Sequence, residues 1–313
     1  MSKLTRREFI LTTSAGLTAL GGSVPVRAAA APGAAGRLGY TLYGMKTVPV
    51  LEALAHCARI GYGNVELPLL PGYPTQPDRL TPALRREIRR QVADLGLTIS
   101  ALTYNMSLTT PDAGQAKHRD GIKLVAEIAR DLAPDRPPPI QTSIGGKAEE
   151  WELLRETMAA RLRAWVETVG KAGGALVITP HVGHAVNSPD RLLWLYRQAA
   201  RPELGLTFDR SHFELEGYSL AQSLPPLAPH TRFVHLKDTQ GTPAGYDSFL
   251  PGEVYPDYPQ YLRMLAEAGY RGPLVVEVSG RISGKPGYDP IAVAQKCYAA
   301  MSDALEKSGR PRG

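Results

Sequence analysis

Two runs with polar ends decide how this chain folds: Gly205-Leu206-Thr207-Phe208-Asp209-Arg210-Ser211-His212 and Phe233-Val234-His235-Leu236-Lys237-Asp238. Each begins with the apolar, β-branched or aromatic residues of a buried strand and ends in titratable side chains. A buried carboxylate is costly unless it is paired or bound to a metal. The two runs therefore predict parallel strands whose carboxyl ends carry a polar site.

The same pattern continues along the chain, where strand-like runs alternate with segments of helical periodicity. The expected strands are 38–43, 64–69, 98–104, 139–144, 175–179, 205–208, 232–236 and 273–278, and the clearest helices are 48–60, 82–95, 151–169 and 261–268. Eight units in about 280 residues predict an α/β fold, a single (β/α)8 TIM barrel over residues 31–313. A doubly wound open sheet is the alternative, but no Gly-x-Gly-x-x-Gly turn follows the first strand.

The first 30 residues are expected to precede the barrel. Arg6 and Arg7 stand before an apolar run over 10–26, and small residues reach Ala30, a pattern that resembles a twin-arginine signal peptide. That resemblance implies a periplasmic or secreted protein, delivered by the twin-arginine export machinery. The run is short and rich in Gly, Ser and Thr, so no stable membrane insertion is expected after cleavage. A basic, frayed N-terminus is the alternative.

Composition and charge limit the partners. The chain has 43% hydrophobic and 21% charged residues, which indicates a globular protein. Its formal charge of +6 falls to about +3 once residues 1–30 are removed, so nucleic acid is not indicated. Cys57 and Cys297 are too few for a disulfide framework or a Cys-rich zinc site, and both are expected to be buried in helices. A closed barrel has no free strand edge, so a homo-oligomer would have to use helices or loops.

Acidic groups and an imidazole at neighbouring strand ends predict a cation site. Asp209, His235 and Glu277 can converge on Zn, Mn, Co or Fe, which accept imidazole and carboxylate ligands. Each residue also has a simpler interpretation. Asp209 could cap a turn, His235 could be a core histidine, and Glu277 could be a salt-bridged strand end. Lys237 could likewise be a solvated loop cation. Their joint occurrence on three consecutive strands favours a shared site.

These residues resemble the sugar phosphate isomerase/epimerase family, the xylose isomerase-like TIM barrels. The matching motifs are Asp209-x-x-His212, His235-x-Lys237-Asp238, Pro251-Gly252-Glu253 and Tyr270-x-Gly272-Pro273 followed by Glu277. The resemblance spans Arg37 to Leu305 and is strongest from Ala175 onward. It implies a divalent metal (Mn, Zn, Co or Mg) held by Glu, Asp, His and Glu, three of which would be Asp209, His235 and Glu277.

The expected first glutamate is absent, because Thr179 stands in its place. His181 or water could fill that position, whereas a threonine hydroxyl cannot serve as the second proton-transfer base. The resemblance also makes Glu253 a substrate-binding candidate. Lys237 is expected to stabilise an enediolate oxygen.

Other mouth residues are candidates for acid/base work or sugar binding. Glu66 is a candidate base or sugar-hydroxyl acceptor, and His212 is expected in the loop over the mouth as an acid/base group. Tyr43, Tyr104 and Asn105 are expected to line the mouth, with the tyrosines stacking on a sugar, although ordinary packing is the alternative. His184 is expected on a surface loop.

Three functions are compatible with these patterns. The favoured one is an exported sugar isomerase/epimerase-like enzyme that abstracts a proton next to a carbonyl of a sugar, inositol or keto-glycoside, with metal assistance through Glu277 and its neighbours. The second is a non-catalytic sugar-binding barrel that lost a ligand at Thr179. The third is a phosphodiesterase with a multi-zinc cluster, which the modest charge and the small number of placeable ligands disfavour. The expected partner is a small carbohydrate.

Overall fold

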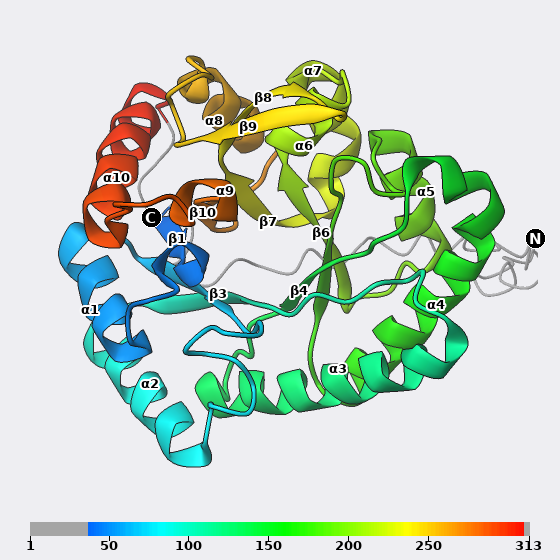
Figure 1. Cartoon of the computed structure of the whole chain (residues 1–313), viewed down its shortest axis with the longest axis horizontal. Helices are drawn as coiled ribbons and strands as arrows, with labels where there is room; N and C mark the ends of the chain where they lie inside the picture. Colours follow the sequence, from blue (N-terminus) through cyan, green and yellow to red (C-terminus); the bar gives the residue numbers. More distant parts are fainter. Residues whose placement is uncertain (1–36, 310–313) are drawn as a thin grey trace, which may run out of the picture.

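The eight predicted strands form one closed parallel barrel, in the order β1-β10-β7-β6-β5-β4-β3-β2 (Figure 1). The computed structural model describes residues 37–309, so the predicted signal peptide lies outside the described residues. The strands are β1 Leu38–Thr41, β2 Asn64–Pro68, β3 Thr98–Thr103, β4 Ile140–Ser143, β5 Leu176–Thr179, β6 Leu204–Asp209, β7 Thr231–Leu236 and β10 Leu274–Val276. The predicted TIM barrel is confirmed.

The core has two parts because each strand presents side chains to both faces of the barrel wall. Most buried apolar residues pack between the wall and the outer helices. A smaller cluster consists of Ala101, Val177, Phe233 and Val275. Val177, Phe233 and Val275 stand two residues before Thr179, His235 and Glu277, respectively. Because side chains alternate along a strand, residues two apart point to the same face of the barrel wall. This apolar layer therefore lies beneath the polar strand ends inside the barrel.

Helices surround the barrel on its outside (Figure 1). They are α1 Val50–Ile60, α2 Pro82–Asp94, α3 Asp112–Leu132, α4 Trp151–Lys171, α5 Pro189–Gln198, α6 Arg210–Leu215, α7 Leu220–Leu227, α8 Tyr258–Glu267, α9 Gly280–Ser283 and α10 Pro290–Lys307. Pro82, Pro189 and Pro290 begin their helices behind capping side chains, as their spacing predicts. Within the described part of the chain, no helix is both long and apolar enough to span a membrane.

An antiparallel hairpin between β7 and α8 was not expected from the sequence. It consists of β8 Asp238–Thr242 and β9 Gly245–Phe249, and most of its residues are exposed. Its strands lack alternating apolar residues, so the usual strand pattern is missing. The hairpin leaves the carboxyl end of β7, with β8 beside α6 and β9 beside α9. It therefore forms part of the wall around the barrel mouth.

Candidate active site at the carboxyl ends of the strands

Five charged side chains meet at the carboxyl end of the barrel, and we call them the charged cluster. They are Glu66 on β2, Asp209 at the end of β6, His235 on β7, Lys237 just after β7 and Glu277 just after β10. Strand pairing places the strand ends together, since β10, β7 and β6 are consecutive in the barrel and Asp209 is opposite His235. The predicted convergence of Asp209, His235 and Glu277 is thus present in the structure.

His235 lies between two carboxylates. Its Nε2 is 2.8 Å from Glu66 Oε2, and its Nδ1 is 2.9 Å from Glu277 Oε2. Burial opposes a charge on the ring, but Glu66 and Glu277 raise the pKa of His235 to about 10. In the absence of a metal, the ring is therefore an imidazolium at neutral pH.

Lys237 lies at the centre of the charged cluster. Its Nζ is 2.9 Å from Asp209 Oδ2 and 3.3 Å from both oxygens of Glu277. Burial opposes the ammonium, yet these two carboxylates raise the pKa of Lys237. Burial likewise opposes both carboxylates, but Lys237 holds the pKa of Asp209 and of Glu277 below their ordinary values. Lys237 is thus a buried, paired cation, and its interpretation as a solvated loop residue is wrong.

Glu66 has partners for both of its carboxylate oxygens. One accepts from the His235 ring, and the other accepts a hydrogen bond from the Thr103 hydroxyl on β3. The residue is only 1% exposed. Glu66 therefore orients His235 and has no free face for a substrate, in contrast to its expected role as base or hydroxyl acceptor.

Asp209 both ends β6 and caps α6, which explains why His212 lies in a helix and not in the expected loop. Asp209 Oδ1 accepts from the Ser211 backbone N–H at 3.0 Å and from the Ser211 hydroxyl at 2.6 Å. The helix therefore begins immediately after the strand. One turn on, His212 is buried with its Nε2 3.0 Å from Lys237 Nζ. Asp209 Oδ2 remains directed towards the charged cluster.

Three histidines form a second group, the histidine stack of His181, His184 and His212. The His181 ring centroid lies 4.1 Å from that of His212 and 4.7 Å from that of His184. Burial lowers the pKa of all three rings, with additional repulsion from Lys237 at His181 and His212, and the pKa of His184 falls to about 4. These rings are neutral, and His184 is half-buried where a surface position was expected.

The remaining predicted residues have other partners than these two groups. Tyr43 stacks on Tyr73 with ring centroids 5.3 Å apart. The Tyr104 ring packs outward, because a Cβ on Gly121 of α3 would lie 2.5 Å from its hydroxyl. Asn105 is exposed, and Glu253 pairs with Lys296 of α10 at 2.7 Å. The expected roles of Tyr104 and Glu253 in the site therefore find no support in the structure.

A divalent cation fits three of the site residues. One ligand atom each from Asp209, His235 and Glu277 lies within 4.8 Å of the other two. Asp209 Oδ2 and His235 Nδ1 have no hydrogen bond of ordinary geometry, although each faces an opposite charge at 2.9 Å. An imidazole with two carboxylates suits Zn, Mn, Co or Fe, and three protein ligands are typical of a catalytic site. Binding requires His235 to lose its proton and the Lys237 ammonium to move aside.

Thr179 provides no carboxylate to this cation site. Its hydroxyl accepts a hydrogen bond from the Gln141 amide of β4, and both side chains are buried. The β3, β4 and β5 side of the mouth thus presents neutral polar groups, including Thr103. Such groups are hard to identify from sequence, since the only signal is a polar residue inside an otherwise buried strand.

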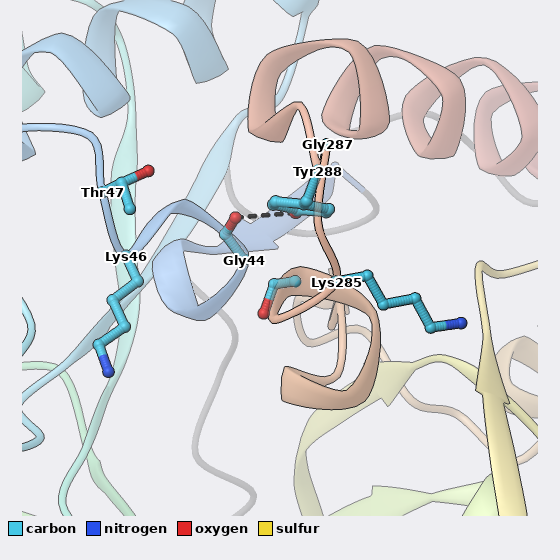
Figure 2. A pocket seen from close by; sticks show the side chains of 7 residues that line it. Gly44, Lys46, Thr47, Lys285, Gly287 and Tyr288 are labelled. Carbon is cyan, nitrogen blue, oxygen red and sulfur yellow. Dashed lines mark hydrogen bonds between the residues drawn. The ribbon is translucent and has the colours of Figure 1, made fainter.

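A cavity of about 240 Å³ opens between the segment after β1 and the segment joining α9 to α10 (Figure 2). Its lining residues are Gly44, Lys46, Thr47, Ser283, Lys285, Gly287 and Tyr288. The Tyr288 hydroxyl donates to the Gly44 carbonyl at 2.8 Å and joins the two segments. Lys46 and Lys285 extend in different directions in Figure 2, so their ammonium groups do not converge on one ligand.

Comparison with known proteins agrees with this architecture. A family model described as "Xylose isomerase-like TIM barrel" matches residues 54–299. The chain belongs to that family. The rhizopine catabolism protein MocC of Rhizobium meliloti is 30% identical to it over 149 residues, which is 42% of this chain and 43% of that protein. The chain thus spans less than half the length of this relative, and the match shows a local likeness.

Several solved structures share the fold of this chain at low sequence identity. A zinc-bound structure of the IolI protein has a TM-score of 0.73 at 18% identity, covering 88% of this chain and 100% of that one. L-ribulose 3-epimerase has a TM-score of 0.68 at 18% identity, covering 87% and 95%. The 3-keto-D-glucoside 4-epimerase YcjR of E. coli has a TM-score of 0.68 at 14% identity, covering 86% and 99%. These likenesses establish the barrel.

Proposed function

We propose that this chain is an exported isomerase/epimerase-like enzyme that abstracts a proton next to a carbonyl of a sugar, inositol or keto-glycoside, with the help of a divalent metal. The observation that carries the proposal is the meeting of Asp209, His235 and Glu277 around the Lys237 ammonium. Family membership and structural neighbours that include two epimerases support this class of reaction.

Glu277 is the best-placed proton acceptor among the three acidic residues. Its side chain is 19% exposed, whereas those of Asp209 and Glu66 are each 1% exposed. Lys237 keeps Glu277 ionised and thus in its basic form. The same ammonium can stabilise negative charge on the substrate oxygen as the proton leaves carbon. Glu277 would then return the proton to the neighbouring carbon or to a leaving group.

A single carboxylate base favours some reactions over others. Epimerisation by two opposed bases needs a second acceptor on the far side of the substrate. By the resemblance to this family, Thr179 stands where that acceptor is expected, and its hydroxyl is already paired with Gln141. Isomerisation or elimination, in which one base acts on one face, agrees better with this side of the mouth.

A bound metal would supply Lewis-acid polarisation of the carbonyl oxygen. Asp209, His235 and Glu277 would hold it. With His235 protonated, the charged cluster has three formal negative and two formal positive charges, so replacement of the imidazole proton by a divalent cation brings the cluster to neutrality. This charge balance is a physical reason for the site to accept a metal.

Metal content and turnover test the proposal together. Protein isolated from its native compartment is analysed for metals and then assayed against keto- and aldo-sugars, inositols and keto-glycosides. Asp209→Ala and His235→Ala are each expected to abolish both bound metal and turnover, and Asp209→Asn, which can still cap α6, separates this loss from a folding defect. Asp131→Ala, which removes an outer acidic residue of α3, serves as the control. Activity that survives thorough chelation would exclude the metal role.

A non-catalytic sugar-binding barrel is the second candidate, because Thr179 lacks a carboxylate and Lys237 fills the space among the ligand atoms. Calorimetry distinguishes the two functions. Binding of a sugar without any product, in protein supplied with Zn, Mn, Co or Mg, would favour this candidate over the enzyme.

The proposed export rests on the sequence pattern at Arg6 and Arg7. Replacing both arginines by lysine should retain the protein in the cytoplasm, as cell fractionation would show. Periplasmic or secreted protein in that variant would contradict the twin-arginine route. An exported enzyme would meet unphosphorylated sugars more often than phosphorylated ones.

A further inference from the structure

Asp238 is a buried carboxylate that contacts none of the charged cluster through its side chain. It directly follows Lys237, is 0% exposed and accepts five hydrogen bonds. Its donors are the Arg210 guanidinium (2.9 Å), the Tyr258 hydroxyl (2.8 Å) and the backbone N–H groups of Gly252 (3.0 Å), Val254 (3.1 Å) and Tyr255 (3.0 Å). A buried charge with this many donors is well compensated.

Arg210 connects this carboxylate to the neighbouring strand. It directly follows Asp209 and is 2% exposed, and its Nη2 donates both to Asp238 and to the Lys237 carbonyl at 3.3 Å. Its guanidinium lies 3.6 Å from the Tyr255 ring centroid. The Arg210–Asp238 pair thus joins the residues that follow the strand ends of β6 and β7.

The segment bound by Asp238 contains the Pro251-Gly252-Glu253 motif. Gly252 has φ of +89°, a backbone conformation that favours glycine, and its N–H points to the Asp238 carboxylate. Glu253 stabilises the same turn by accepting from the Leu250 N–H at 2.8 Å. This motif therefore shapes a turn that surrounds Asp238, which explains why Glu253 lies outside the charged cluster.

We propose that Asp238 is a positioning residue: through Arg210 and the 251–255 turn it fixes the end of β7 and so holds Lys237 against Asp209 and Glu277. Lys237 is the residue before Asp238, and Asp209 is the residue before Arg210. Any shift between the two strand ends would thus change the 2.9 Å distance from Lys237 Nζ to Asp209 Oδ2 directly. The catalytic consequence of this positioning rests on the proposed function, whereas the geometry does not.

The experiment follows the Lys237 ammonium by nitrogen-15 NMR of lysine-labelled full-length protein, with the signal assigned by its loss in Lys237→Met. Asp238→Asn keeps the shape of the side chain but removes the charge. It is expected to shift the Lys237 signal and to speed its exchange with water by about tenfold or more, as local order is lost. Asp131→Asn breaks the Arg85–Asp131 pair (2.8 Å) on the outer helices and should leave the signal unchanged.

A milder variant keeps the test decisive if Asp238→Asn does not fold. Tyr258→Phe removes one hydrogen bond to Asp238 and should change the Lys237 signal in the same direction, to a smaller extent. An unchanged Lys237 signal in folded Asp238→Asn, or in Tyr258→Phe when only that variant folds, would overturn the proposal. With a turned-over sugar in hand, kcat should fall more than KM changes. Since the NMR result needs no substrate, failure to find turnover would affect the proposed function alone.

Discussion

The charged cluster and the histidine stack lie side by side at the barrel mouth, yet the pKa of a histidine is raised in the first and lowered in the second. His235 between Glu66 and Glu277 has a pKa raised to about 10, whereas His212, whose Nε2 lies 3.0 Å from Lys237 Nζ, has a pKa well below its ordinary value. Burial is common to both and opposes a charge in each. At His235 the two carboxylates outweigh burial and raise the pKa, whereas at His212 burial and the Lys237 ammonium together outweigh Asp209 and lower the pKa.

The difference in charge suits the two regions to different roles. The charged cluster has the groups that can hold a cation, accept a proton and stabilise an anion. The histidine stack, with its neutral rings, can donate and accept hydrogen bonds to hydroxyl groups without adding charge. A polyol substrate would need both kinds of surface. The following four changes test how far the two regions depend on Lys237 and on each other.

The largest effect is expected from Lys237→Met, which removes the cation that both regions share. Asp209 then keeps only its hydrogen bonds from Ser211, and Glu277 keeps only His235, so the metal-free protein should lose about 3–5 kcal/mol of stability in urea denaturation. Turnover should fall by about 10²–10³-fold with loss of the charge that stabilises the transition state. Lys296→Met removes an exposed pair and should cost at most about 1 kcal/mol. Equal losses in both variants would mean that Lys237 has no special role.

Glu66→Gln tests the charged cluster while leaving the histidine stack intact. Without its carboxylate partner, His235 is less firmly oriented and less basic, so affinity for zinc should fall by about 10–100-fold in competition with a chelator. Glu127→Gln, on the outer face of α3, is the control. Unchanged zinc affinity would show that Glu66 does not support His235 as a ligand.

Thr179→Glu introduces a carboxylate on the neutral side of the mouth, where related barrels are expected to have one. A fourth ligand should strengthen zinc binding by about tenfold, or about 1.4 kcal/mol. Thr179→Gln has the same size without the charge and should show no such gain. If both variants bind zinc equally, the three-residue cation site does not extend to β5.

The smallest effect concerns the histidine stack and pH. Burial lowers the pKa of His184 from 6.5 to about 4, so the unfolded chain takes up a proton first as the pH falls. Stability should therefore decrease from about pH 6.5 to about pH 4, by about 1 kcal/mol for this half-buried ring. His184→Gln should reduce that slope, whereas Asn105→Gln, at an exposed position without a titratable group, should not. A slope unaffected by His184→Gln would mean that the ring is not held neutral by the stack.

Much of the barrel is predictable from sequence because its strands repeat a local pattern. Runs such as Asn64–Pro68 and Leu204–Asp209 are buried at every position, and most of their residues are apolar. The convergence of Asp209, His235 and Glu277 follows from the same pattern, since parallel strands in a closed barrel end on one face.

The partners of those residues could not be predicted, because pairing depends on side-chain geometry across strands. Nothing in the sequence shows that Glu66 accepts hydrogen bonds from His235 and Thr103, or that Lys237 forms an ion pair with Asp209. The β8–β9 hairpin was missed for a different reason: its exposed strands have no apolar period to detect. Local patterns thus predict the framework, and long-range contacts determine the charge states within it.

Asp209 has two separate interactions, one through each carboxylate oxygen. Alanine and asparagine substitutions at this residue therefore remove different interactions. One of its oxygens starts the helix that carries His212, and the other faces Lys237. Alanine would remove both interactions and confound a folding defect with a chemical one. Asparagine can still cap the helix while lacking the negative charge, so the difference between the two variants separates what this aspartate does as architecture from what it does as an anion.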